Sequence, residues 1–389
     1  MKVVFFHDHR IVNYKNKNYS NGSFSDEVFN RYTNVFGHIT FYSRNVLLDK
    51  MEKKLSQIIN EKVDFIGIKD FSNFLNYKTR YKFNYQIETS DAIIVRLPSV
   101  LGLLAARKAK QKCKPYLIEL VGCPWDALWN HSWKGKLVAP FMWYSTKKAV
   151  KNAPYVLYVS SNFLQKRYPN NFNNISCSDV DLQPVKQDVL DQRLEKIKNM
   201  NKNKPLVLCT IANVDVKYKR QDLVIKAISE LNIQGYNFEY RLVGGGNTTH
   251  LQSIAEKYGV ADKVIFEGSV PHEKVFDYLD DIDIYIQPSD AESHGRVILE
   301  AMSRGCPCIG SSTGGIPELI DASFIFERRN VNELIDILAS FDREKMIKQA
   351  KRNFEFAKRF DKNLLDDKRN EFLLSFKKYA DQDLQGENK

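Results

Sequence analysis

The sequence predicts an α/β fold in which two Rossmann-like, doubly wound domains face a central cleft. The chain has 389 residues, which is more than a single hydrophobic core usually holds. Short apolar runs alternate with stretches of helical periodicity in both halves, the pattern of βαβ units on parallel sheets. A polar stretch of weak periodicity, residues 170–204, separates the two series. We therefore expect an N-terminal domain over residues 1–185 and a C-terminal domain over 200–360, with a helix at about 361–389 packing back on the first.

The first half contains six apolar runs of strand length. A helix over residues 24–36 is predicted by apolar side chains on one face, and Ser23 and Asp26 have the spacing of a capping box at its start. Residues 7–20 are predicted to form a loop over the cleft. The predicted strands cover residues 3–6, 39–42, 64–68, 92–97, 116–121 and 155–159.

The second half repeats the alternation after the polar stretch, which we interpret as the connection between the domains. Charged sequence of helical character follows from about residue 333 to 379. The predicted strands cover residues 206–211, 238–243, 264–266, 282–286, 307–311 and 323–326, and helices are predicted to begin near Gln221, Thr249, His272, Arg296, Ile316 and Asn332.

The composition is that of a soluble globular protein, with 43% hydrophobic and 27% charged residues. No apolar run approaches the roughly 18–20 residues that a membrane-spanning helix needs. The apolar stretch at the N-terminus is too short for a signal peptide, so we expect a cytoplasmic protein. The six cysteines are scattered, and we expect buried free thiols rather than a disulfide or zinc site.

The formal net charge of +11 favours an anionic partner. No RNA-binding motif, zinc finger or arginine-rich arm is present, so a nucleic acid is not expected. Basic residues interleave with aromatic ones in residues 82–86, in residues 143–155 and in the C-terminal tail. This pattern suits peripheral contact with an anionic membrane. The alternative is a solvated, lysine-rich surface.

The segment SDAESHGRVILEAMSRGCPCIGSSTGGIPELI, residues 289–320, carries the strongest functional signal. Glu292 lies in the loop after a predicted strand, and Gly295 at the start of the next helix allows a backbone to approach closely. Glu300 lies farther along, and eight helical residues span about 12 Å, so the two carboxylates are not expected to form one acid/base pair. They suit two hydroxyl-bearing parts of one extended ligand. The alternative is a capped helix with a surface glutamate.

These two glutamates with their central glycine, followed by EAMSRGCPCIGSSTGGIPEL, resemble the donor site of retaining GT-B glycosyltransferases of the family 4 group. LVGGG, VIFEGSVPHEKVFDYL and DIYIQPSDAES resemble the same family in order and spacing throughout the C-terminal half. The N-terminal half is similar only through IELVGCPWDALW and VLYVSSNFLQKRYP, which resemble enzymes of bacterial capsule and surface-polysaccharide synthesis.

The resemblance implies roles for individual residues. Glu292 would meet hydroxyl groups of the donor sugar and act in catalysis, and Glu300 would hold the nucleotide ribose. Backbone groups after Glu292 would also meet the sugar. The remaining donor-side residues that the resemblance implies in this half are Gly244, Val270, Ser293, His294 and Gly295. For Gly244 the alternative is a tight strand-to-helix turn without a role in binding.

The donor diphosphate needs cations, and TIANVDVKYKRQD, residues 210–222, resembles the family's loop with an Arg followed by Lys-Gly. Lys219 falls on the lysine position, where it would also stabilise the leaving group. Asn213 stands where many members have arginine, and Arg220 replaces the glycine. Asn213 offers hydrogen bonds without charge. Lys217 is predicted to compensate, with an exposed basic turn as the alternative.

In the first domain, the resemblance implies that a loop with Gly22 approaches the donor phosphates. Many members place a His or Asp near the reacting sugar after the fifth strand. Asp126 and Glu119 are the available groups here, and we select Asp126 as the catalytic candidate, with a structural aspartate as the alternative. The acceptor-side candidates are Trp125, Trp129 and His131.

The resulting hypothesis is a retaining transfer of a sugar from a UDP- or GDP-sugar to a hydroxyl group of a lipid-linked saccharide acceptor in bacterial surface-polysaccharide synthesis. No strong enzymic nucleophile and no metal-ligand spacing are evident, so no metal or further cofactor is expected. A nucleotide-sugar epimerase and a non-catalytic nucleotide-sugar-binding scaffold remain alternatives. A glycosidase is disfavoured because such enzymes place their carboxyl groups about 5–9.5 Å apart across one bond.

Overall fold

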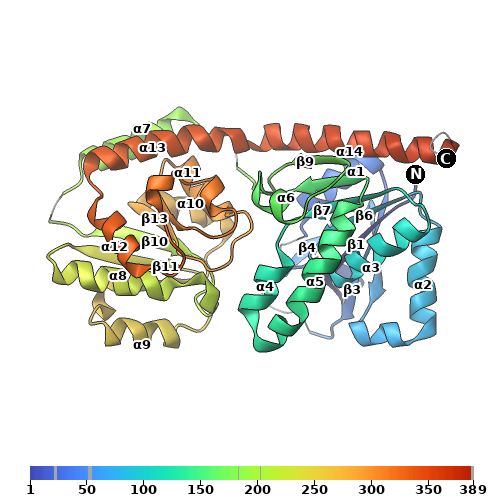
Figure 1. Cartoon of the computed structure of the whole chain (residues 1–389), viewed down its shortest axis with the longest axis horizontal. Coiled ribbons are helices and arrows are strands. Elements are labelled where there is room, and N and C mark those ends of the chain that lie inside the picture. The colour runs from blue at the N-terminus through green and yellow to red at the C-terminus, as the bar shows by residue number, and fades with distance from the viewer. Residues whose placement is uncertain (22–23, 51–54, 183, 202, 387–389) are drawn as a thin grey trace. The chain divides into compact units, whose positions relative to one another are not determined.

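The computed structural model describes residues 1–21, 24–50, 55–182, 184–201 and 203–386 (Figure 1). The chain divides into two compact units. Unit 1 comprises Met1–Trp125, Leu137–Cys177 and Asp366–Lys389, and unit 2 comprises Asp126–Lys136 and Ser178–Leu365. The chain therefore leaves unit 1, builds most of unit 2, and returns to unit 1 at its C-terminal end.

The sheet of unit 1 has a parallel core in the order β5-β3-β1-β6-β7-β8-β9. Strands β2 and β4 extend it antiparallel beside the far end of β1. The central strand β6 is buried along its whole length, as expected for a parallel sheet covered on both faces. The strands are β1 (Val3–Tyr14), β2 (Lys17–Ser20), β3 (Ile39–Leu47), β4 (Ser56–Ile58), β5 (Val63–Ile68), β6 (Ala92–Leu97), β7 (Tyr116–Leu120), β8 (Tyr155–Tyr158) and β9 (Asn173–Ser176).

Unit 1 also contains most of the helices of the N-terminal half and most of one helix, α14, from the C-terminal end of the chain. The N-terminus of α3 is capped by Ser99, and the Asp8 carboxylate accepts hydrogen bonds from the free N–H groups of Val100 and Leu101. The helices are α1 (Asp26–Phe36), η1 (Phe71–Leu75), α2 (Tyr77–Glu88), α3 (Val100–Gln111), α4 (Pro124–His131), α5 (Trp133–Lys151), α6 (Phe163–Arg167) and α14 (Lys362–Gln385).

The sheet of unit 2 is parallel throughout, in the order β12-β11-β10-β13-β14-β15. The strand order reverses between β10 and β13, and in open α/β sheets ligands bind beyond the carboxyl ends of the strands at such a point. The strands are β10 (Leu206–Ile211), β11 (Phe238–Val243), β12 (Val264–Gly268), β13 (Ile284–Gln287), β14 (Cys308–Ser311) and β15 (Ile325–Phe326).

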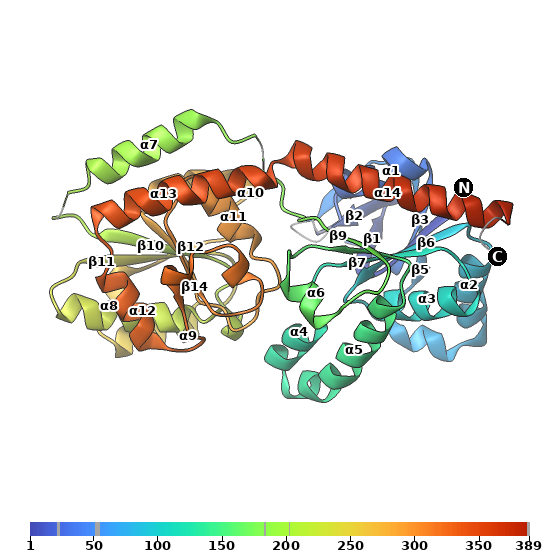
Figure 2. The same cartoon turned by 45° about the horizontal axis from the view of Figure 1, so that its top comes forward.

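Helices cover both faces of this sheet. Figure 2 shows α7, α11 and α13 on one face and α8 and α12 on the other. The fold class predicted from the sequence, two doubly wound α/β domains, is confirmed. The helices are α7 (Gln187–Lys198), η2 (Lys217–Lys219), α8 (Gln221–Ile233), α9 (Thr249–Lys257), η3 (Ala261–Lys263), α10 (His272–Asp281), α11 (Arg296–Ser303), η4 (Ile316–Glu318), η5 (Ala322–Phe324), α12 (Val331–Ala339), α13 (Arg343–Ala357) and η6 (Lys358–Phe360).

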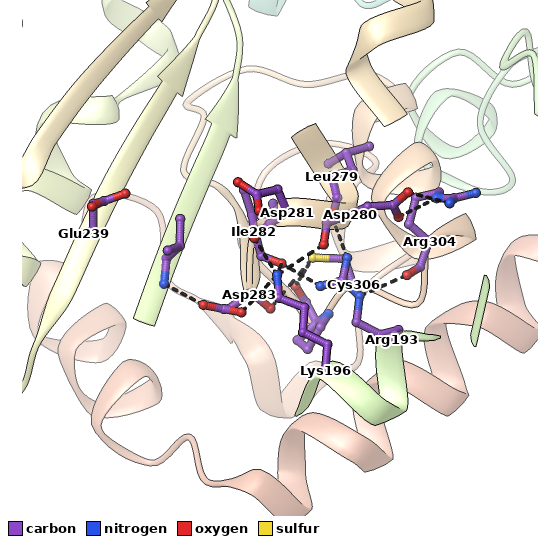
Figure 3. Close-up of polar contacts among 12 residues, drawn as sticks. Arg193, Lys196, Glu239, Leu279, Asp280, Asp281, Ile282, Asp283, Arg304 and Cys306 are labelled. Atoms are coloured by element: carbon purple, nitrogen blue, oxygen red, sulfur yellow. Dashed lines mark hydrogen bonds and ion pairs between the residues drawn. The ribbon is translucent and has the colours of Figure 1, made fainter. Parts of the chain in front are cut away.

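Helix α7 is fixed to unit 2 by two cations that cap the C-terminus of α10 (Figure 3). The buried Arg193 guanidinium donates to the carbonyl oxygens of Leu279, Ile282 and Arg304. Lys196 donates to the Ile282 carbonyl oxygen at 2.9 Å and pairs at 3.3 Å with the carboxylate of Asp283, directly before β13. Cations are favourable at a helix C-terminus because the last carbonyl groups lack partners within the helix.

Three sequence-based expectations were wrong. Residues 7–20 form no loop, because β1 continues to Tyr14 and turns into β2. The stretch 170–204 is more than a connection, since it supplies β9 to unit 1 and α7 to unit 2. The predicted capping box does not start α1: Ser23 lies outside the described residues, Ser25 occupies the N-cap position, and the Asp26 carboxylate instead accepts from backbone N–H groups of residues 59 and 60.

Two further points concern thiols and membranes. All six cysteines are free, and five are buried as expected, but Cys113 at the end of α3 is exposed. None of the helices in the described ranges combines the length and the apolar character needed to cross a bilayer.

Candidate active site

The candidate site of unit 2 forms where the loops after β10 and β13 meet. The first loop carries Lys219 in η2, and the second carries Glu292. The Nζ atom of Lys219 lies 2.9 Å from Oε2 of Glu292, and the side chains are 21% and 19% exposed. A backbone hydrogen bond of 2.7 Å from Asp290 to Tyr218 joins the same two loops. Both predicted catalytic residues of this unit are therefore in direct contact at the switch point of the sheet.

The Gly314-Gly315 turn packs directly against the backbone of the Glu292 loop. A Cβ atom at Gly314 would lie 1.7 Å from the carbonyl oxygen of Glu292, and one at Gly315 would lie 2.6 Å from that of Ser293. The Gly315 N–H group donates to the Glu292 carbonyl at 3.1 Å. Glycine is required here because any side chain would displace the loop. The glycine pair that follows the two glutamates in the sequence thus positions the first of them.

Opposing effects set the protonation of Glu292. Burial by itself raises the pKa of this carboxyl, but the Lys219 ammonium group and the Gly295 N–H, which donates to Oε1 at 3.3 Å, outweigh it and leave the pKa below its ordinary value. Gln287 completes the surroundings with an amide nitrogen 3.4 Å from Oε2. Glu292 is therefore ionised at neutral pH, and its charge is balanced by one lysine.

Gly295 contacts the site through its backbone, whereas the side chain of His294 is buried in the protein. Gly295 is the N-cap of α11 with φ of 82°, a left-handed conformation that favours glycine, and its N–H group points to the Glu292 carboxylate. The His294 side chain is buried and bonded to the hydroxyl of Ser178, and burial lowers the pKa of its imidazole. Only the backbone of His294 was predicted to meet the ligand, and its ring is held within the protein.

Glu300 lies on α11 with 6% of the residue exposed, and it meets a residue that the sequence analysis missed. The Nε2 atom of His272 lies 3.3 Å from Oε1 of Glu300, and this hydrogen bond raises the pKa of the imidazole above its ordinary value. His272 is the first residue of α10, two positions after the predicted Val270 in the loop behind β12. Its position at a helix start after a strand was the signal that could have revealed it.

Known proteins resemble this region and the whole chain in sequence. Residues 191–363, which include the whole Lys219–Glu292–Glu300 region, match the family model described as glycosyl transferases group 1. Protein CapJ of Staphylococcus aureus is 32% identical over 391 residues, covering 97% of this chain and 96% of that protein. The chain belongs to the glycosyl transferases group 1 family. It is accordingly a glycosyltransferase, as the two glutamates predicted.

More distant relatives agree with this assignment. A putative colanic acid biosynthesis glycosyltransferase, WcaL of Salmonella typhimurium, is 31% identical over 149 residues, 36% of each chain. The crystal structure of Anabaena HepE in complex with UDP has a TM-score of 0.68 and 16% identity, covering 96% of this chain and 100% of that one. The structural likeness extends over both units and confirms the GT-B class of fold.

Arg220, which stands where the resemblance implies a glycine, lies in the loop after β10. Its φ of 56° is left-handed, a conformation that favours glycine. The Arg220 guanidinium pairs with Asp222 at 3.1 Å and lies 4.0 Å from Asp290. Asp290, 4% exposed, also pairs with Arg329 at 2.8 Å and with Arg328 at 3.6 Å. This arginine cluster, which the sequence analysis missed, fixes the Glu292 loop from its N-terminal side.

Asn213 and Lys217 are exposed, and Lys217 lines a cavity of about 360 Å³ between the start of α8 and the start of α9. Gly244 closes the neighbouring turn, because a Cβ atom there would lie 2.0 Å from the carbonyl oxygen of Ala212. Gln221 donates to the Asn213 carbonyl at 3.2 Å. The glycine at 244 is thus required by backbone packing, and Lys217 is an exposed cation at the edge of the cavity.

The predicted residues of the first half lie in or before α4. Trp125 packs edge-on against Trp143, with ring centroids 6.3 Å apart, and Trp129 is 40% exposed beneath the ammonium group of Lys136. Asp126 is partly buried in the first turn of α4, and His131 is exposed at its end. Gly22 lies outside the described residues.

Two histidines of unit 1 were not anticipated. His7 and His9 lie in the middle of β1, where burial, followed by nearby arginines, lowers the pKa of His7 to about 3 and that of His9 to about 4. The His9 N–H group donates to Nδ1 of His7 at 2.9 Å, so His7 carries its proton on Nε2. Glu119 lies at the same edge of the sheet, 3.7 Å from Arg96. Within the described ranges, no group of three or more His, Cys, Asp and Glu side chains has the arrangement of a metal site.

Proposed function

We propose that this glycosyltransferase moves a sugar from a UDP- or GDP-sugar to a hydroxyl group of a lipid-linked saccharide, with retention of anomeric configuration. The observation that carries the proposal is the Lys219–Glu292 pair at the switch point of the unit 2 sheet, with Glu300 on the adjoining helix. A lysine in contact with one of two successive carboxylates suits a donor that carries a diphosphate between a sugar and a ribose.

The donor would rearrange the charges of this pair. Lys219 now neutralises Glu292, and a bound diphosphate would offer it a second anionic partner. As the bond to the sugar breaks, negative charge grows on the diphosphate, and Lys219 with Lys217 would stabilise it. Glu292, released in part from Lys219, would accept hydrogen bonds from sugar hydroxyls and favour positive charge on the ring.

Retention is proposed from the resemblance to retaining glycosyltransferases, and the pair contains no effective nucleophile for a double displacement. Glu292 is held by Lys219, Gly295 and Gln287, and a carboxylate so bonded attacks carbon poorly. The acceptor hydroxyl would instead attack on the face that the diphosphate leaves, and the diphosphate would take the hydroxyl proton. Asp126 is proposed to assist from α4, and Trp125, Trp129 and His131 to meet the acceptor. No metal is proposed, since lysines supply the countercharge.

The substrate class rests on the relatives. WcaL is named for colanic acid biosynthesis, AmsK of Erwinia amylovora for amylovoran biosynthesis, and the Anabaena HepE structures hold UDP or UDP-glucose. These names support a nucleotide-sugar donor and a role in synthesis of a bacterial surface polysaccharide. Ribose recognition by Glu300 and His272 would be common to UDP and GDP donors.

A panel of UDP-, GDP- and dTDP-sugars, tested by thermal shift, identifies the donor, because a ligand that binds only the folded state raises its melting temperature. The cognate donor should stabilise the wild type and lose most of that effect in Glu300→Ala. Nucleotide release should then require a saccharide acceptor. Stabilisation without release would indicate a scaffold, and conversion of the donor sugar without an acceptor would indicate an epimerase.

A further inference from the structure

Helix α5 presents large apolar side chains to solvent on the face opposite its core contacts. Leu137 is 73% exposed, Phe141 69% and Tyr144 60%, and their spacing of four and three residues puts them on one side of the helix. The opposite side is buried through Ala139, Met142, Thr146 and Val150. We call the stripe of Leu137, Phe141 and Tyr144 the α5 face. A scattered exposed leucine needs no explanation, but three large apolar residues in one stripe do.

Positive charge continues the α5 face along the helix. Lys148 and Lys151 continue the same stripe toward the C-terminal end of the helix, and both are exposed. Residues 127–178 contain no Asp or Glu but seven Lys and Arg. An apolar stripe that ends in lysines, in a segment without acidic residues, is typical of helices that lie in the interface of an anionic bilayer.

The structure separates this helix from the other two basic, aromatic stretches. In the C-terminal tail, Phe372 and Phe376 are buried and pack on Tyr155 with ring centroids 5.3 and 5.4 Å away. In α2, Tyr77, Tyr81 and Tyr85 are exposed along one side of the helix, but no exposed aliphatic side chain accompanies them, because Phe83 and Ile87 are buried. Of the three stretches, only α5 therefore combines exposed aliphatic and aromatic side chains with exposed lysines in one stripe.

We propose that the α5 face docks this enzyme on an anionic membrane surface, with Leu137, Phe141 and Tyr144 entering the headgroup layer and Lys148 and Lys151 contacting lipid phosphates. A second copy of the chain is the less suitable occupant. A symmetric dimer through this face would bring the same lysines of both copies together with no acidic partner in residues 127–178. A bilayer with anionic lipids supplies both the apolar layer and the countercharge.

The proposal goes beyond the proposed function, because it assigns a place of action and needs no particular donor or acceptor. It is tested on the full-length protein by sedimentation with vesicles, without any turnover. Failure of vesicle binding would leave the donor-binding experiment unaffected, and failure of donor binding would leave the membrane result unaffected.

The wild type should bind phosphatidylglycerol-containing vesicles and bind pure phosphatidylcholine vesicles much more weakly. Leu137→Ser with Phe141→Ser should lower the affinity by about tenfold for each side chain. The matched control is Leu75→Ser with Ile233→Ser, which removes two other exposed apolar residues, 85% and 84% exposed, and should leave binding unchanged. Because all four positions are exposed, all variants should keep the melting temperature of the wild type.

The contribution of the two lysines of the α5 face is tested separately, with a lysine of another helix as the control. Lys148→Gln and Lys151→Gln should each reduce binding by about fivefold, whereas Lys198→Gln on α7 should not. Raising the salt concentration should weaken wild-type binding, since screening shortens the reach of the lysines. Equal binding of the Leu137/Phe141 variant and the wild type would overturn the proposal, as would salt-independent binding. Dimerisation in light scattering that the same variant abolishes would assign the α5 face to a second copy instead.

Discussion

Replacing Lys219 by methionine should destabilise unit 2 by leaving Glu292 ionised, mostly buried and without its cation. At the observed 2.9 Å, two unit charges in a medium of effective dielectric constant about 20 attract by about 6 kcal/mol before any desolvation is subtracted. Breaking a buried pair costs about 3–5 kcal/mol. Since each side chain is about one-fifth exposed, we expect a loss of about 2–3 kcal/mol at neutral pH.

A double-mutant cycle isolates this term. Lys219→Met with Glu292→Gln removes the uncompensated charge, so the double variant should regain most of the stability lost in Lys219→Met, while transfer activity stays absent. Urea unfolding followed by circular dichroism is the suitable assay, because residues 178–365 contain no tryptophan to report on the core of unit 2. Additive effects of the two substitutions would refute the coupling.

The pH dependence gives a second check on the same pair. In the folded wild type the pKa of Glu292 lies below its ordinary value of 4.5, so the pair stabilises the fold fully above that value and less as the pH falls through the folded pKa. The stability difference between wild type and Lys219→Met should therefore shrink as acid protonates Glu292. A difference that stays constant from neutral to acid pH would show that the charge on Glu292 is not its origin.

Three further predictions concern the supports of the site. Gly314→Ala should abolish transfer while unit 2 still folds, because its Cβ would overlap the Glu292 carbonyl oxygen, and circular dichroism with an activity assay would show this; an active variant would contradict the assigned role of the turn. NMR titration should give His272 a pKa above 6.5 that returns to about that value in Glu300→Gln. The stability from this pair is therefore present below pH 6.5 and lost as the pH rises through the raised pKa. An unchanged pKa in the variant would show that the hydrogen bond to Glu300 does not cause the shift. Arg193→Ala should cost about 3 kcal/mol in calorimetry, since buried carbonyl groups at the end of α10 lose their donor, and Arg343→Ala, whose guanidinium is bonded at the surface, should cost far less.

The sequence was most informative where strands are buried on both faces. The runs that became β6 and β10 are apolar at all but one position each, and their predicted bounds match the structure. It was least informative where strands are polar. The second half of β1 begins with His7, Asp8, His9 and Arg10, and its turn depends on positive φ at Lys15 and Asn16, which gives little signal in the letters alone. The asparagine-rich β9 was missed for the same reason.

The site shows the same division. The contact of Lys219 with Glu292 was predictable, because their loops leave neighbouring strands at the point where the strand order reverses. The arginines around Asp290 were not, because Arg328 and Arg329 come from a loop far along the chain and only packing brings them there. The role of Gly314 as a support also depends on a backbone contact across the fold.

The order of the chain through the two units has a consequence for biosynthesis. Unit 1 needs Asp366–Lys389, whose Phe372 and Phe376 cover Tyr155, and these residues are synthesised after unit 2. The residues of unit 2 have all been synthesised by then. During translation, Tyr155 therefore remains uncovered until unit 2 has been synthesised. Removal of Asp366–Lys389 should leave this aromatic surface exposed permanently and promote aggregation of the newly made enzyme.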